Sequence, residues 1–185
     1  VGNFEFLACI PGTVGGGIKM NAGCFNKEFK DILISIQAID KDGKVFTIPA
    51  NKVLFEYRNN DLPDDLIFLS ASFKGEKKDK DKIKKEVFDL KNIKDSTQPT
   101  KIKTSGSTFK NPIKQSDKKV WQLIKESVPV KKSFGDACIS NKHCNFFVNK
   151  NNASFEDMIK LSNFVQDEVK KKTGIVLEKE IKILE

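Results

Sequence analysis

Residues 31–50 read DILISIQAIDKDGKVFTIPA, two apolar-rich runs joined by the turn KDGK. The runs 31–40 and 44–50 carry Ile, Val and Phe, which favour strands, and a short turn containing Gly commonly joins two antiparallel strands. We therefore expect a β-hairpin here. It is the clearest local indication of a fold that contains antiparallel sheet.

After this hairpin, the segment DDLIFLSASFKG (64–75) predicts another strand, because Ile67, Leu69 and Ala71 alternate with Phe68, Ser70 and Ser72. The charged run GEKKDKDKIKKE (75–86) follows, and it is typical of a hinge leading into a helix with Ile83, Val87 and Leu90 on one stripe. We expect the domain boundary in this run.

The second half contains both helices and strands, in a mixed order. A short helix is expected around Val120, Leu123 and Ile124, and HCNFFVNKNN (143–152) reads as a strand that ends in an Asn-rich turn. Ser154 and Asp157 resemble a capping box. The helix that they begin is expected to end at Gly174 and to carry the apolar stripe Met158, Leu161, Val165 and Val169. Residues 175–184, IVLEKEIKIL, are expected to form the last strand. Segregated strands and helices predict the α+β class.

Composition limits the function classes. The 185 residues carry a formal charge of +8, and of 33 basic residues only Arg58 is arginine. A nucleic-acid reader normally uses Arg for base contacts, so we expect no nucleic-acid partner. The lysine excess reflects either a compositional bias or an affinity for anions such as phosphates. No apolar run is long enough to span a membrane. We also expect no signal peptide, because the first residues lack a basic leader and a long apolar block. Four dispersed cysteines favour a reduced cytoplasmic protein without metal.

Residues 11–17, PGTVGGG, are unusually rich in glycine. Glycines allow backbone N–H groups to approach a pyrophosphate closely. The run has neither the P-loop nor the Rossmann spacing, and a tight strand-to-helix turn explains it equally well.

Arg58, after Tyr57, is the only arginine in a lysine-rich chain. A planar, permanently charged guanidinium can hold an oxyanion with two donors, which Lys cannot do. The alternative is a surface residue without a special role.

Residues 104–112, TSGSTFKNP, are predicted to form a loop, punctuated by Gly106 and Pro112. The loop is either an ordinary solvated turn or a site that presents Ser107 to a cleft. A serine hydroxyl is a weak acid, and it can protonate only a strong base such as a carbanion or enolate. His143 is the only histidine and no nucleophile elbow is present, which disfavours a serine hydrolase.

Near the end of the chain, LEKEIKIL would place Glu178 and Glu180 on one face of a strand, either as surface charge or as a site.

Five segments follow one another along the chain: IPGTVGG…MNAG, YR, SGSTFKNP, ISNKHCNFFVN and LEKEI. With these segments in this order, almost the whole chain resembles the UDP-N-acetylenolpyruvoylglucosamine reductases, the MurB family of peptidoglycan synthesis. The resemblance implies that NADPH reduces FAD, which then reduces the enolpyruvyl group of UDP-N-acetylglucosamine enolpyruvate. It implies that Arg58 polarises the substrate carboxylate, that Ser107 protonates the carbanion, and that Glu180 assists the enolate.

The resemblance also implies the binding residues. Those expected to contact the flavin are Ile10, Pro11, Gly12, Thr13, Val14, Gly15, Gly16, Asn21 and Gly23. Those expected to contact the substrate are Tyr57, Lys110, Asn111 and His143.

By this resemblance, residues 1–76 are expected to be the C-terminal part of a two-lobed FAD-binding domain, and residues 77–185 the substrate-binding domain. We expect the first FAD-binding lobe to be missing from the chain and the protein to be monomeric. The alternative function is an inactive remnant that binds a UDP-sugar or a partner without redox chemistry.

Overall fold

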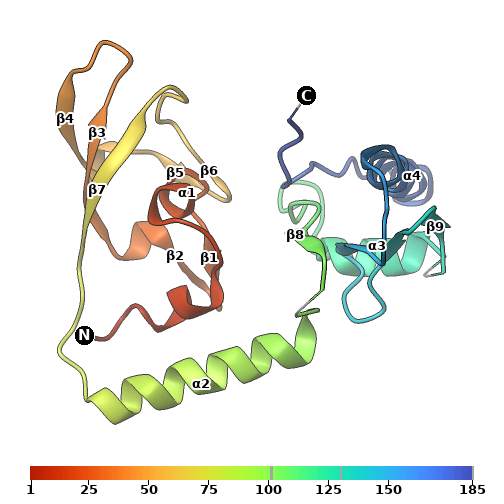
Figure 1. The fold of residues 1–185 in the computed structure, drawn as a ribbon, viewed down its shortest axis with the longest axis horizontal. Coiled ribbons are helices and arrows are strands. Elements are labelled where there is room, and N and C mark those ends of the chain that lie inside the picture. Colours follow the sequence, from red (N-terminus) through yellow and green to blue (C-terminus); the bar gives the residue numbers. More distant parts are fainter. Residues whose placement is uncertain (101, 130, 185) are drawn as a thin grey trace. The chain divides into compact units, whose positions relative to one another are not determined.

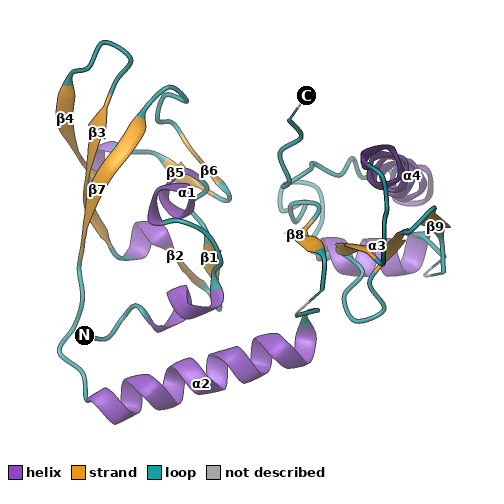
Figure 2. Cartoon of the chain, viewed as in Figure 1, coloured by secondary structure: helices purple, strands orange, loops and turns teal. Residues whose placement is uncertain are grey.

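A computed structural model describes residues 1–100, 102–129 and 131–184, and the chain divides into two compact units, Val1–Lys94 and Asp95–Glu185. Helix α2 (Lys80–Thr97) runs through the point of division. Helices and antiparallel strands make up both units (Figure 1; Figure 2), so the mixed class that the sequence predicted is present. The functional division at residue 76 stays a prediction.

The first unit is built on a three-stranded antiparallel sheet in the order β4-β3-β7. The predicted hairpin is confirmed as β3 (Leu33–Ile39) and β4 (Val45–Pro49), and the next predicted strand is β7 (Ile67–Phe73). Helix α1 (Val14–Lys19) belongs to the same unit. Its remaining elements are the two-residue strands β1 (Gly23–Cys24), β2 (Lys27–Glu28), β5 (Phe55–Glu56) and β6 (Asn59–Asn60), and the 3₁₀ helices Glu5–Cys9, Phe29–Asp31 and Ala50–Lys52.

Apolar side chains from α1, the second 3₁₀ helix and β3 form the core of this unit. They are Ile18, Phe29, Leu33, Ile36 and Ala38. Alternation along β3 places Ile36 and Ala38 fully inside, because successive side chains of a strand point to opposite faces.

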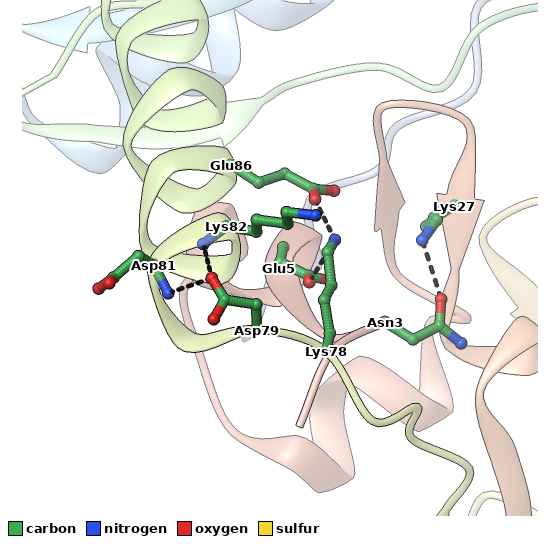
Figure 3. A network of polar contacts seen from close by, with 8 residues as sticks. All are labelled: Asn3, Glu5, Lys27, Lys78, Asp79, Asp81, Lys82 and Glu86. Carbon is green, nitrogen blue, oxygen red and sulfur yellow. Dashed lines mark hydrogen bonds and ion pairs between the residues drawn. The ribbon is translucent and has the colours of Figure 1, made fainter.

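The N-terminal segment is joined to the start of α2 by a polar network (Figure 3). Lys78 forms ion pairs with Glu5, at 2.9 Å, and with Glu86. Asp79 caps the helix, since its Oδ1 accepts hydrogen bonds from the backbone N–H groups of Asp81 and Lys82. The expected hinge is therefore a short capped entry into a helix, and the predicted stripe of Ile83, Val87 and Leu90 is half-buried.

The second unit contains a four-stranded antiparallel sheet in the order β8-β11-β10-β9. Its elements are β8 (Thr104–Ser107), α3 (Val120–Ser127), β9 (Ser133–Phe134), β10 (Ala137–Ile139), β11 (Phe146–Asn149) and α4 (Phe155–Thr173). The two predicted helices are confirmed. Ser154 and Asp157 form the predicted capping box, and Gly174 ends α4 in the left-handed conformation at φ +74°.

The core of this unit lies between the sheet and helices α3 and α4. The predicted stripes meet there: Val120, Leu123, Ile124, Leu161, Val165 and Val169 are all buried. The other buried members of this core are Phe109, Val128, Ala137, Ile139, Cys144, Phe147 and Leu177.

Two predictions about local structure are wrong. Residues 104–107 are not loop but strand β8, because they pair with β11, which the polar sequence alone did not indicate. Residues 175–184 form no extended strand; within 175–184 only Lys179 forms a bridge, to Phe109. An alternating pattern can form a ladder only where a neighbouring strand continues beside it.

Candidate functional site

The glycine-rich turn leads from a 3₁₀ helix into α1, not from a strand as one alternative required. Thr13 caps the helix, since its Oγ1 accepts a hydrogen bond from the Gly16 N–H at 3.1 Å. Residues 11–14 are exposed. Gly12 has φ +117°, and a Cβ placed there would meet no atom within 4 Å. The turn therefore presents open backbone to the surface, as a phosphate-binding segment requires.

The segment that follows the turn packs around the side chain of Asn21, which is fully buried. The Asn21 Nδ2 donates to the Glu56 carbonyl at 3.0 Å and to Glu28 Oε2 at 2.9 Å, while its Oδ1 accepts from the Lys30 N–H. Both polar atoms of this amide are thus bonded to protein. Asn21 holds the turn in place.

Tyr57 and Arg58 form the two-residue tip of the β5–β6 hairpin. Arg58 has φ +56°. Its Nη2 donates to the Gly23 carbonyl at 2.8 Å, its Nη1 to the Asn21 carbonyl at 3.5 Å, and its guanidinium carbon lies 5.0 Å from the centroid of the Tyr57 ring. A guanidinium can serve two carbonyls at once and stack on a ring, whereas an ammonium cannot match this geometry. The structure thus joins the YR and MNAG segments.

These residues suit an anionic pyrophosphate. Between Ile10 and Gly23 there is no acidic side chain, and Lys19 is the only ionisable one. Exposed backbone with glycines and no negative charge is the chemistry that a dinucleotide cofactor needs from one side of its site. The residues present therefore fit part of a flavin dinucleotide site.

In the second unit, Ser107 lies at the end of β8, paired with Phe146 of β11. It is half-buried. Gly106 has φ +86°, and a Cβ there would meet nothing within 4 Å, so the strand is open to space at the residue before the serine. The serine is thus held at the end of a paired strand rather than in a solvated turn, and its role stays a prediction.

The C-terminal segment runs beside the residues that follow Ser107 (Figure 1). The Glu180 N–H donates to the Thr108 carbonyl at 2.8 Å, and the Lys110 N–H donates to the Glu178 carbonyl at 2.9 Å. This antiparallel contact joins the GSTFKNP and LEKEI segments, which lie far apart in the sequence.

The two glutamates have different environments. The Lys110 ammonium pairs with Glu178 at 2.5 Å, and the Glu178 side chain is 72% exposed. Glu180 is half-buried. Asn111 Oδ1 accepts a hydrogen bond from the Val120 N–H at 3.0 Å, so Asn111 also supports the start of α3.

His143 lies in an aromatic environment. Its ring packs edge to face on Phe146, with centroids 4.9 Å apart, and lies 6.4 Å from Trp121. Burial lowers the pKa of the imidazole below its ordinary value. Its Nδ1 accepts a hydrogen bond from the Asn145 N–H at 3.3 Å, which agrees with a neutral ring that acts through hydrogen bonds rather than charge.

Two buried asparagines escaped the sequence reasoning. The amide of Asn60 donates to the carbonyls of Ile18 and Lys19 and supports the end of α1. Asn145 bonds to the segment after Ser107. For Asn145 the only available indication was its position inside the strand expected at 143–152, where Asn is disfavoured.

Within the described residues no helix is long and apolar enough to cross a membrane. Nor do those residues include a cluster of three or more His, Cys, Asp or Glu side chains suited to a metal ion.

Comparison with known proteins gives consistent results. Residues 98–184 match the family described as "UDP-N-acetylenolpyruvoylglucosamine reductase, C-terminal domain". A reductase of that name from Pelagibacter ubique is 77% identical over 184 residues, which cover 100% of this chain and 61% of the relative. One from Rickettsia bellii is 46% identical over 98% of this chain and 59% of its own length.

The solved structure of the UDP-N-acetylenolpyruvylglucosamine reductase (MurB) from Thermus caldophilus is also similar. It matches with a TM-score of 0.84 at 32% identity, over 98% of this chain and 64% of that one. The chain thus spans about three fifths of the length of the curated relatives that it matches.

Proposed function

Because the chain belongs to the UDP-N-acetylenolpyruvoylglucosamine reductase (MurB) family, we propose that it takes part in reducing the enolpyruvyl group of UDP-N-acetylglucosamine enolpyruvate to give UDP-N-acetylmuramate. FAD, when bound, would supply the hydride, which it takes from NADPH. The reaction belongs to peptidoglycan synthesis. We propose that the protein acts in the cytoplasm, because the reaction uses a nucleotide sugar and NADPH.

In this proposal the first unit holds the cofactor and the substrate carboxylate. The open turn at residues 11–16 would hold the FAD pyrophosphate. Arg58, fixed by its bonds to the 21–23 turn, places its positive charge at the carboxylate. As hydride adds to the double bond, negative charge spreads from the carbon beside the carboxylate onto the carboxylate oxygens. A fixed cation stabilises that charge without reorganising.

The second unit completes the addition. The Ser107 hydroxyl gives its proton to the carbanion, so one hydride and one proton have been added across the double bond, and solvent restores the serine proton. Glu180 lies beside the enolate. Of the residues proposed to contact the UDP-sugar, Lys110, Asn111 and neutral His143 belong to this unit and Tyr57 to the first. The Lys110 ammonium and the Asn111 amide suit a diphosphate.

The observation that carries this proposal is the antiparallel contact between residues 108–110 and 178–180. It brings together the two segments that bear Ser107 and Glu180, the expected acid and its assistant.

Stopped-flow measurement of flavin oxidation state in the full-length natural protein tests the roles. Ser107→Ala should leave reduction by NADPH unchanged and slow reoxidation by the enolpyruvyl sugar about 10²- to 10⁴-fold, the usual contribution of a positioned acid. Ser107→Cys should recover part of the rate, because a thiol is the stronger acid.

The matched control is Ser105→Ala, which removes an exposed hydroxyl two residues earlier in the same strand. It should reoxidise at the wild-type rate. Equal reoxidation in all four proteins would refute the acid role, and a colourless protein that still binds a UDP-sugar would favour the inactive remnant.

A further inference from the structure

Asn145, the residue directly before β11, holds the chain next to Ser107. It is 3% exposed. Its Oδ1 accepts from the Phe109 N–H at 3.0 Å, its Nδ2 donates to the Phe109 carbonyl at 2.8 Å, and its own carbonyl accepts from the Thr108 N–H at 2.8 Å. Three hydrogen bonds from one residue thus fix the two residues that follow the serine.

These bonds lie where the chain changes partners. Ser107 pairs with Phe146 of β11, and Thr108 bonds on one side to Asn145 and on the other to Glu180, whereas Phe109 forms its bridge with Lys179. Phe109 is 1% exposed at this junction. Its N–H and carbonyl have no strand neighbour on the β11 side, and buried backbone groups need partners. The amide of Asn145 takes the place of the missing strand.

We propose that Asn145 is a positioning residue for the reaction, which sets the place of the Ser107 hydroxyl relative to Glu180. This rests on the proposed function, in which Ser107 is the acid. The Asn145 amide holds the backbone of Phe109, and the neighbouring Thr108 carbonyl accepts the Glu180 N–H. The side chain therefore fixes the segment that carries the acid at one end and bonds to the assistant. A displacement of about 1 Å at a reacting group can cost about 10²-fold in rate.

The chain offers a matched control in Asn149, four residues along on β11. Asn149 Oδ1 accepts from the Ala153 N–H at 2.9 Å, and its Nδ2 donates to the Ala153 carbonyl at 3.3 Å. The same two-way amide contact thus holds a turn before α4 rather than the segment after Ser107. Asn149→Ala removes hydrogen bonds of the same kind from the same strand.

The experiment compares Asn145→Ala and Asn149→Ala in the full-length natural protein by stopped flow. Asn145→Ala should slow flavin reoxidation by the enolpyruvyl sugar about 10²-fold, with reduction by NADPH unchanged. Asn149→Ala should change reoxidation less than about threefold, although both variants lower the unfolding midpoint, since each loses two hydrogen bonds. Equal slowing by the two variants would mean that Asn145 serves the fold alone and would overturn the proposal.

A double variant separates positioning from general damage. If Asn145 acts through Ser107, adding Asn145→Ala to Ser107→Ala should cause no further slowing, because no hydroxyl remains to be misplaced. A further slowing as large as in the wild-type background would overturn the proposal. Should Asn145→Ala not fold, Asn145→Asp keeps the shape and one acceptor but loses the donor to Phe109, and it allows the same comparison.

The outcomes also separate this proposal from the proposed function. If Ser107→Ala reoxidises normally, the acid role fails and the positioning role fails with it. If Ser107→Ala is slow but Asn145→Ala and Asn145→Asp are normal, the acid role stands and only the positioning role is wrong.

Discussion

Replacing Gly17 with alanine tests whether the glycine run serves packing as well as an open turn. A Cβ on Gly17 would lie 2.3 Å from Phe29 Cζ and 2.4 Å from its Cε2. The Phe29 ring is 4% exposed and packs edge to face on Phe73, with centroids 6.1 Å apart, so it cannot swing aside without disturbing the core.

Two opposing effects set the size of the change. Overpacking of a core costs about 1–3 kcal/mol. Replacing glycine with alanine inside a helix gains about 0.5–1 kcal/mol. The clash is the larger effect, and Gly17→Ala should lower the free energy of unfolding by roughly 1–2 kcal/mol. Urea unfolding followed by circular dichroism measures the difference.

Gly15→Ala is the matched control in the same helix. Its Cβ would lie 3.8 Å from Phe68 Cβ, an ordinary van der Waals contact. Only the gain in helix propensity remains, so the free energy of unfolding should be about 0.5 kcal/mol higher than in the wild type. By the proposed function, the same methyl group would crowd the pyrophosphate and weaken FAD binding. If both variants shift stability in the same direction, the packing argument for Gly17 is refuted.

Three further predictions concern single side chains. Arg58→Lys keeps the charge but cannot serve two carbonyls, so turnover of the full-length protein should fall about 10²-fold with flavin reduction by NADPH little changed; near-normal steady-state turnover would make the arginine structural only. The pKa of the single histidine, His143, should lie below the ordinary imidazole value when measured by NMR, because burial disfavours the charged ring in the folded state. The stability that the neutral ring contributes should be lost as pH falls below the ordinary value. An NMR midpoint at or above the ordinary value would contradict the buried position. Burial alone would raise the pKa of Glu5, but hydrogen bonds from Lys78 and the backbone outweigh this effect, so the net pKa lies below the ordinary carboxyl value (Figure 3). The stability that this group contributes is present above the ordinary carboxyl pKa and is lost as pH falls through the lowered pKa. Lys78→Met should reduce that acid dependence in thermal melts at several pH values.

Much of the local structure could be predicted because it depends on neighbouring residues. The 31–50 hairpin, the capping box at Ser154 and the stripes of α3 and α4 follow from turn chemistry and from periodicity, which act over a few residues. The four motifs with possible chemistry were also visible as patterns, since each is a compact group of unusual residues.

The sequence could not predict which of those motifs meet. Arg58 joins the 21–23 turn, and residues 178–180 join residues 108–110, through hydrogen bonds between segments distant in the chain. Pairing with β11 made a strand of 104–107, whereas within 175–184 only Lys179 found a bridge partner, Phe109. Asn145 was marked only as an Asn inside an expected strand, because a side-chain amide that replaces a strand can be recognised only once the residues that it bonds lie beside it. Patterns along the chain determine which elements can form, but hydrogen-bond partners in a sheet are settled in space, where every buried N–H and carbonyl must find one.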